Sequence, residues 1–126
     1  MAGDVVDCDD EVMKRFSKKN PSIRWHIACI CGSSKFKDDM LAEAKRLTLN
    51  GHVVVMPHVF SHCGDEITDE QKVKLDDLHR RKIDMAESVV IVTRNGYIGE
   101  STRSEIEYAE KMNKDIYYED YGEGKQ

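Results

Sequence analysis

Apolar residues gather in four short runs along the chain, and polar or turn-forming residues separate the runs. The runs cover residues 27–31, 53–56, 89–92 and 116–118. A strand of a parallel sheet is covered on both faces, so it loses the alternation of polar and apolar side chains that marks a half-exposed strand. The four runs therefore predict the strands of a mostly parallel sheet.

Apolar residues at helical spacing fill the segments between the runs. The first such segment covers 36–49 and ends at Asn50 and Gly51, which form a helix stop. The second covers 68–85 and the third about 101–113. Strands that alternate with helices imply right-handed crossover connections. The prediction is a single α/β domain of Rossmann-like, three-layer architecture, with a mostly parallel sheet of four to five strands.

The chain has 126 residues, which is about the size of one domain. Residues 1–22 predict an accessory segment, because the aspartates at 9–10 can cap a short helix that extends to Phe16. Residues 23–121 predict the Rossmann-like domain itself. The short tail after it is expected to fray.

Composition and charge exclude several classes of protein. Hydrophobic residues make up 40% of the chain and charged residues 34%, which provides a core and excludes the signature of disorder. The net charge of −5 disfavours long nucleic acid as a partner, although a local basic pocket for one phosphate is compatible with it. No apolar run approaches the roughly 18 residues of a membrane span, and the start of the chain is acidic, so neither a membrane nor export is expected. Four scattered cysteines fit a reducing cytoplasm.

The expected ligand site lies at the carboxyl ends of the predicted strands. In open α/β sheets, ligands bind outside these ends, where successive connections diverge to opposite faces of the sheet. Three loops converge there, covering 31–36, 57–69 and 93–101.

The loop after the first strand is suited to an anion. It places Gly32, a hydroxyl pair that includes Ser33, and a lysine pair that includes Lys35 between a strand and a helix start, where unpaired backbone amides point outward. An ordinary strand-to-helix turn with serine caps explains the same residues. The loop matches neither the phosphate-loop pattern nor the dinucleotide fingerprint, so no cofactor is expected.

Glu105 is the candidate catalytic residue near the start of the last helix. It shares a stripe with Ala109 and Met112, at spacings of four and seven, so its carboxylate is expected at the end of the buried face of the helix. The alternative is a capping box, in which Thr102 and Glu105 satisfy backbone amides.

The candidate substrate-binding residues come from the loops after the first and third strands. Glycines in the latter loop let the backbone approach a ligand closely, and hydroxyls stand at the start of the helix that follows. The full set is Cys31, Gly32, Ser33, Lys35, Phe36, Gly96, Tyr97, Gly99, Ser101 and Arg103.

Other histidines and cysteines are weaker candidates. His58, His62 and Cys63 have a spacing that could hold a metal, but they share one irregular loop with no second ligand pair, so no metal is expected. Cys29 and Cys31 lie in an apolar run and are expected to be core thiols rather than nucleophiles.

Three segments carry a more specific signal when they are taken together. They are Ile-Cys-Gly-Ser-Ser at 30–34, His-Arg-Arg-Lys-Ile-Asp-Met-Ala-Glu at 79–87, and Gly-Tyr-Ile-Gly-Glu-Ser-Thr-Arg-Ser-Glu-Ile-Glu-Tyr-Ala at 96–109. In order and spacing they resemble the nucleoside 2-deoxyribosyltransferase superfamily, which includes the 2-deoxynucleoside 5-phosphate N-hydrolases. The resemblance extends from about Trp25 to Tyr118 and is nearest to short bacterial and phage members of uncertain activity.

The resemblance implies that Glu105 is a nucleophile. Members place a glutamate near the start of this helix, four residues before an alanine that Ala109 matches, and use it to attack the anomeric carbon of a nucleoside. A carboxylate can trap the oxocarbenium-like sugar as a glycosyl-enzyme, and a helix start favours its ionised form.

The chain also departs from the family pattern. His79 stands where many members carry an aspartate; it can act as an acid or orient the glutamate, whereas its basic neighbours alone are compatible with a solvated helix face. Cys29 stands where the hydrolases place a tyrosine. Lys35 stands where they place an arginine, which keeps the charge but loses the bidentate geometry. These departures affect the expected reaction and substrate more than the expected fold.

Two functions follow as alternatives. The first is an enzyme that cleaves or transfers at the N-glycosidic bond of a (deoxy)nucleoside or nucleoside 5-monophosphate. The second is a non-catalytic nucleotide-binding or sensing module of the same fold, and a purely structural or protein-interaction role is a more distant third. The base, the sugar, and the choice between hydrolysis and transfer stay open. A homodimer or larger assembly is expected, because members complete their pockets with a neighbouring subunit and a short chain encloses a ligand poorly.

Overall fold

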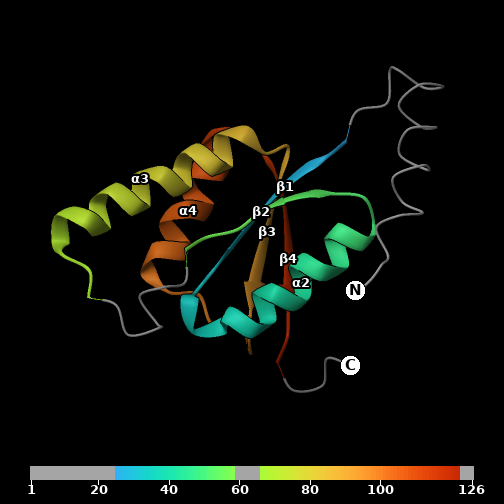
Figure 1. Cartoon of the computed structure of the whole chain (residues 1–126), viewed down its shortest axis with the longest axis horizontal. Coiled ribbons are helices and arrows are strands. Elements are labelled where there is room, and N and C mark those ends of the chain that lie inside the picture. Colours follow the sequence, from blue (N-terminus) through green and yellow to red (C-terminus); the bar gives the residue numbers. More distant parts are fainter. Residues whose placement is uncertain (1–24, 59–65, 123–126) are drawn as a thin grey trace, which may run out of the picture.

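The computed structural model describes residues 25–58 and 66–122, which form a sheet with helices on both faces (Figure 1). The predicted accessory segment 1–22 lies outside the described residues. The same is true of His62 and Cys63, two of the three residues of the weak metal candidate.

Within the described residues, four strands form one all-parallel sheet. They are β1 (Ile27–Gly32), β2 (Val53–Val55), β3 (Ser88–Thr93) and β4 (Asp115–Asp120), in the spatial order β2-β1-β3-β4. In the centre, Cys29 of β1 pairs with Val55 on one side and with Val89 on the other. The α/β class and the parallel sheet are thus confirmed, and each strand lies within two residues of its predicted bounds.

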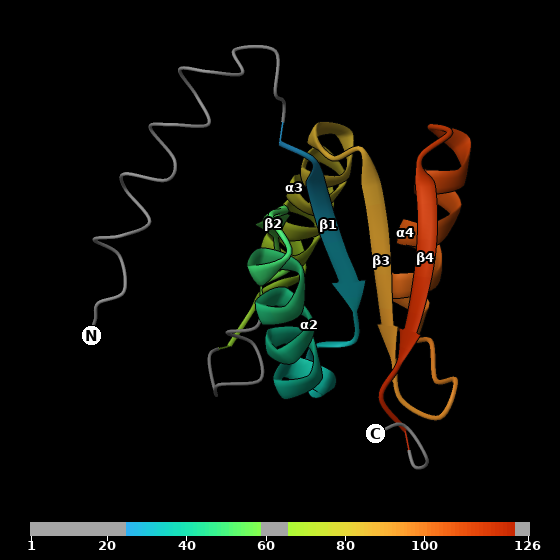
Figure 2. The same ribbon diagram turned by 90° about the vertical axis from the view of Figure 1, so that its right-hand side faces the viewer.

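In the part of the chain that the structure describes, three helices and a short 3-10 turn connect the strands. The turn η1 (Ser34–Phe36) and α2 (Lys37–Leu49) follow β1, α3 (Asp69–Met85) precedes β3, and α4 (Glu100–Lys111) precedes β4. Figure 1 shows α2 on one side of the sheet and α3 and α4 on the other, and Figure 2 shows β1, β3 and β4 running in one direction. The predicted three-layer architecture is therefore confirmed.

Local signals fix two of the helix ends. Thr68 Oγ1 accepts a hydrogen bond from the Gln71 amide at 3.1 Å, and the Gln71 side chain accepts one from the Thr68 amide at 3.0 Å, which forms the capping box that opens α3. After α2, Gly51 adopts a φ of +89°, a left-handed conformation that glycine takes without strain. Both ends agree with the sequence.

The side chains of β1 alternate between two hydrophobic cores. Its odd-numbered residues face α3 and α4, and its even-numbered residues face α2. The first core comprises Cys29, Cys31, Ile83, Ala86, Val89, Ile91, Ile106 and Ala109. The second comprises Ala28, Ile30, Met40, Leu47, Val90 and Val92.

The end of α4 differs from the sequence expectation. Met112 is 43% exposed, because α4 ends at Lys111 and Asn113 turns into a left-handed conformation with a φ of +60°. The buried stripe that Glu105 begins therefore ends at Ala109, which is fully buried.

The strand order creates a divergence point between β1 and β3. The connection after β1 runs through α2 on one face, whereas the connection after β3 runs through α4 on the other. Ligands of open α/β sheets bind at the carboxyl side of such a point.

Candidate functional site

A pocket of about 350 Å³ lies at the divergence point, beyond the carboxyl ends of the strands. Its walls come from the loops after β1 and β2, from residues 72–79 of α3 and from the first turns of α4. Its volume falls within the roughly 300–1,000 Å³ that small-molecule sites occupy. The predicted site residues on its lining are Gly32, Ser33, His79, Gly99, Ser101 and Glu105.

Glu105 lines the pocket from α4, with its side chain 15% exposed. The helix begins at Glu100 with Gly99 as its N-cap, so Thr102 occupies the third helical position and Glu105 the sixth. A capping box requires its serine or threonine at the N-cap itself. The capping alternative for Glu105 is therefore wrong, and the buried carboxylate needs another explanation.

His79 faces Glu105 from α3. Its side chain is 4% exposed, and its Nε2 lies 3.6 Å from Glu105 Oε1. The alternative of a solvated helix face is therefore wrong for this residue. Within the described part of the chain, its Nδ1 is a buried nitrogen without a hydrogen-bond partner. Such an atom costs free energy unless a ligand or water supplies the missing bond.

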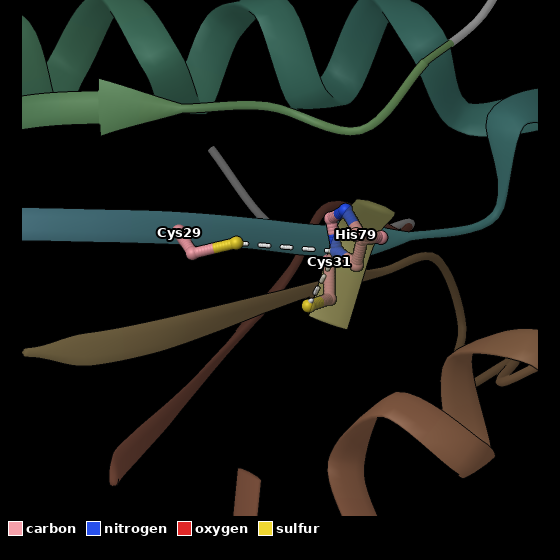
Figure 3. A group of neighbouring side chains, drawn as sticks. All are labelled: Cys29, Cys31 and His79. Atoms are coloured by element: carbon pink, nitrogen blue, oxygen red, sulfur yellow. Dashed lines mark hydrogen bonds between the residues drawn. The ribbon is translucent and has the colours of Figure 1, made fainter. Parts of the chain in front are cut away.

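Two buried thiols also contact the imidazole of His79 (Figure 3). Cys31 Sγ lies 3.2 Å and Cys29 Sγ 3.9 Å from His79 Nε2. Both cysteines are fully buried, as expected of core thiols. The sequence did not suggest that a histidine would meet them, because His79 is about fifty residues away along the chain and belongs to another element.

The groups of this cluster alter one another's protonation. Burial raises the pKa of Glu105, although the imidazole of His79 opposes the rise. Burial disfavours the charged form of His79, but the hydrogen bond to Cys29 and the charge of Glu105 outweigh it and raise the pKa of the imidazole. The hydrogen bond with Cys31 lowers the pKa of Cys29 to about 6, and the same bond together with burial raises the pKa of Cys31. The imidazole, the carboxylate and the two thiols therefore titrate as one coupled group.

The loop after β1 contributes Gly32, Ser33 and Ser34 to the pocket lining. A Cβ on Gly32 would stand 2.9 Å from the Val92 carbonyl oxygen and 3.2 Å from Met40 Sδ, so glycine is required for the packing of β1 against β3. Ser33 Oγ accepts a hydrogen bond from the Lys35 amide at 3.4 Å and caps the 3-10 turn. The serine-capped turn is therefore present, and it forms one wall of the pocket.

Three predicted residues meet beside the pocket rather than on its lining. Lys35 Nζ lies 3.9 Å from the centroid of the Tyr97 ring and 5.9 Å from that of Phe36. The rings of Phe36 and Tyr97 pack edge to face, with their centroids 5.8 Å apart. This cation–π cluster ties the loop after β1 to the loop after β3.

The remaining predicted residues also lie off the lining. Gly96 has a φ of +75° and donates its amide hydrogen to Asp120 at 2.8 Å, so its glycine serves a left-handed turn. Arg103 is exposed on α4. Cys31 is not on the lining, and its Sγ contacts His79, which is.

Lys72 and Asp76 of α3 line the pocket, and the sequence did not suggest either. Lys72 Nζ donates hydrogen bonds to Ser101 and Asp76, each at 3.3 Å. A lysine and an aspartate four residues apart usually indicate an exposed helix face. The approach of α3 to the start of α4 turns this face toward the pocket, and that approach depends on tertiary packing.

The first turn of α4 lies at the pocket. Gly99, Glu100, Ser101 and Thr102 line it, and no side-chain hydrogen bond caps the helix at Gly99. A helix start of this kind favours an anion. Lys72 stands next to this helix start, on a lining that also holds the acidic residues Asp76, Glu100 and Glu105.

Comparison with models of known protein families finds no family that matches the chain, and no curated protein matches it. None of the helices in the described ranges combines the length and the apolar composition that a membrane span requires.

Proposed function

We propose that this protein cleaves or transfers at the N-glycosidic bond of a nucleoside or nucleoside 5-monophosphate, with Glu105 as the nucleophile. The observation that carries the proposal is the buried pair of Glu105 and His79 in the pocket wall, 3.6 Å apart. A carboxylate and an imidazole supply the nucleophile and the acid that this chemistry needs. The resemblance of three sequence segments to the nucleoside 2-deoxyribosyltransferase superfamily supports the same reaction.

In the first step, a carboxylate oxygen of Glu105 attacks the anomeric carbon of the sugar. The new carbon–oxygen bond forms as the N-glycosidic bond breaks, and the base leaves with the bonding electrons. His79, in its protonated form, donates a proton to the departing base. We assign this bond to its Nδ1, the buried nitrogen that has no hydrogen-bond partner among the described residues.

In the second step, a nucleophile releases the sugar from the glutamyl ester. Water gives the free sugar, whereas a ring nitrogen of a second base gives a new nucleoside. Either attack restores the carboxylate of Glu105, and the proton lost by the nucleophile returns to His79. The open alternatives of hydrolysis and transfer differ only in this step.

Lys72 and the start of α4 are the groups we assign to an anionic part of the ligand. Lys72 lines the pocket and already donates to Ser101, so its ammonium is held beside the amides of the helix start. A phosphate placed there would receive charge-assisted hydrogen bonds from both. Lys35 is the earlier, sequence-based candidate for the same role.

A panel of nucleosides and nucleoside monophosphates tests the proposal. Each compound is incubated with the full chain, and released base is measured by chromatography. Release from at least one compound supports the enzyme. No release from any compound, together with a rise in melting temperature on addition of a monophosphate, would replace the enzyme by the nucleotide-binding module, because a ligand of the native state must stabilise it.

We also propose a homo-oligomer, because a chain of this size leaves its pocket exposed at the end of a single sheet. Helix α3 both lines the pocket and carries apolar side chains that the described residues leave uncovered, among them Leu78 and Met85. A second copy of the chain on this helix would cover them next to the pocket.

A further inference from the structure

Cys29, Cys31 and His79 bring together three metal-ligating atoms. Two sulfurs and a ring nitrogen lie within 4.8 Å of one another, and all three residues are buried. Figure 3 shows both sulfurs connected to the same nitrogen of the imidazole. The cysteines leave the same face of β1, because they are two residues apart, and His79 approaches that face from α3. The ligands thus stand on rigid elements, which hold a metal site more accurately than loops do.

The contacts of His79 Nε2 are close to the ligand spacing of a tetrahedral metal site. With usual zinc bond lengths, sulfur and nitrogen ligands stand about 3.5 Å apart, and nitrogen and oxygen ligands about 3.3 Å apart. Here the sulfur–nitrogen distances to His79 Nε2 are 3.2 Å for Cys31 and 3.9 Å for Cys29. Glu105 Oε1 lies 3.6 Å from the same nitrogen. Shifts of a few tenths of an ångström would bring these three contacts of His79 Nε2 to the expected distances.

We infer that Cys29, Cys31 and His79 bind Zn²⁺ and that Glu105 completes the tetrahedron from the pocket side. Thiolate and imidazole together are ligands that select zinc over the hard cations magnesium and calcium. The inference differs from the sequence-based expectation of no metal, because that expectation considered the histidines and the cysteine of a single loop.

Charge and access are compatible with the ion. Two thiolates and one carboxylate around a divalent cation leave one negative charge, and Lys82 lies close enough to act on the charge of Cys29. Lys82 is held in place by a hydrogen bond from its Nζ to the Met56 carbonyl oxygen at 2.8 Å. His79 and Glu105 line the pocket, so an ion can reach the ligands from solvent.

The metal site goes beyond the proposed function. While the ion is bound, the proposed glycosidic reaction cannot take place. A carboxylate of Glu105 that coordinates zinc cannot attack a sugar, and a coordinated imidazole cannot carry a proton at Nε2. If the chain is an N-glycosidase, zinc is therefore expected to inhibit it reversibly, and a chelator is expected to restore it. Binding of the ion does not require that the chain be an enzyme.

The test is a titration of the full chain carrying Cys8→Ser and Cys63→Ser with Co²⁺, under reducing conditions without oxygen. In this variant Cys29 and Cys31 are the remaining cysteines. The expected result is saturation at one equivalent, with thiolate-to-cobalt charge-transfer absorption and the intense d–d absorption of a four-coordinate ion, both abolished by added Zn²⁺. Absence of the charge-transfer absorption would overturn the site, whatever the result with nucleosides.

Two glutamine variants in this background test the fourth ligand. Glu105→Gln is expected to change the d–d bands and retain the charge-transfer bands, because the sulfur ligands stay. Glu107→Gln, whose residue is exposed on the same helix, is expected to leave both unchanged. Identical spectra for the two variants would remove Glu105 from the site. A folded His79→Ala chain that keeps the original spectrum would contradict the histidine ligand.

Discussion

The substitution Glu105→Gln distinguishes a catalytic role of this carboxylate from a role in packing. Glutamine fills the same space on α4, but its neutral amide cannot form a glycosyl ester. We expect Glu105→Gln, assayed free of metal, to lower the rate of base release by a factor on the order of 10³ or more. Monophosphate binding and the melting temperature should persist. Chromatography of released base and thermal melting measure the two effects.

Glu107 provides the matched control for this change. It lies two residues further along α4, is exposed, and points to another side of the helix. Glu107→Gln should behave like the parent in both assays. Retention of most base-releasing activity by Glu105→Gln would show that the proposed mechanism is wrong.

Lys72 and Lys35 are alternative candidates for the lysine that binds a phosphate of the ligand. A hydrogen bond to a charged group contributes roughly 1.5–3 kcal/mol, so loss of the correct lysine should weaken a monophosphate about tenfold or more. The geometry favours Lys72, which lines the pocket, whereas Lys35 rests on the Tyr97 ring. We expect Lys72→Ala to weaken the binding of a monophosphate and to leave the binding of its nucleoside unchanged, as measured by calorimetry. The reverse order, with Lys35→Ala the more damaging, would restore the sequence-based assignment.

At the scale of elements, Asp120 joins the end of β4 to the loop after β3. Its carboxylate accepts hydrogen bonds from the amides of Gly122 at 2.7 Å, Gly96 at 2.8 Å and Asn95 at 3.1 Å, and from the Thr93 hydroxyl at 3.1 Å. The Gly122 amide first, and then the others, lower the pKa of Asp120. The loop that leads into α4 is thus held by a negative charge.

This lowered pKa has a predictable effect on stability. The carboxylate stabilises the fold above its unfolded pKa of about 3.9, and the contribution is lost as the pH falls through the lower pKa of the folded state. Asp120→Asn should therefore melt at a lower temperature than the parent at about pH 7, and the difference should narrow at about pH 3. Circular dichroism melts measure it. Asp115→Asn, an exposed aspartate of the same strand, should change little at either pH, and a gap for Asp120→Asn that is independent of pH would contradict the assignment.

The strands and helices could be predicted because their signals are local. The apolar run of β1 and the capping box at Thr68 each involve neighbouring residues, so the sequence places them within one or two positions. The start of α4 was harder, because Gly99 caps it without a side chain and Thr102 offers a false cap. If the helix began one turn later, at Thr102, Glu105 would be a capping residue. Because it begins after Gly99, Glu105 lines the pocket instead.

The site was only partly predictable because its contacts join distant elements. The sequence indicates that Cys29 and Cys31 share a face of β1, but not which residue of α3 packs on that face. That residue depends on how α3 slides and rotates against the sheet, which is set by packing rather than by periodicity. Lys72 was missed for the same reason, whereas Glu105 was found through its stripe with Ala109.

At the scale of the whole molecule, the state of assembly can be tested through exposed leucines. Leu78 and Met85 of α3 are 49% and 58% exposed and lie seven residues apart, on one side of the helix. We expect the parent to scatter light as at least a dimer of its 14.5 kDa chain at micromolar concentration. Leu78→Asp should shift the mass toward the monomer, because a charge would be buried in the interface.

Leu49 supplies the control on the opposite layer. It lies at the end of α2 and is 76% exposed, so Leu49→Asp adds the same charge on the other face of the sheet. This variant should keep the mass of the parent. A monomeric parent would contradict the assembly, and equal effects of the two variants would move the interface away from α3.

The alternation of β1 also bears on how the protein can evolve. The side of the strand that carries Cys29 and Cys31 holds the sulfur, imidazole and carboxylate groups, whereas Ala28 and Ile30 belong to an apolar cluster beneath α2. Substitutions in separate clusters without shared partners tend to contribute additively to stability. Stabilising changes around Met40 can therefore accumulate while the chemistry on the other layer varies, so selection can act on the scaffold and on the reactive groups independently although one strand carries both.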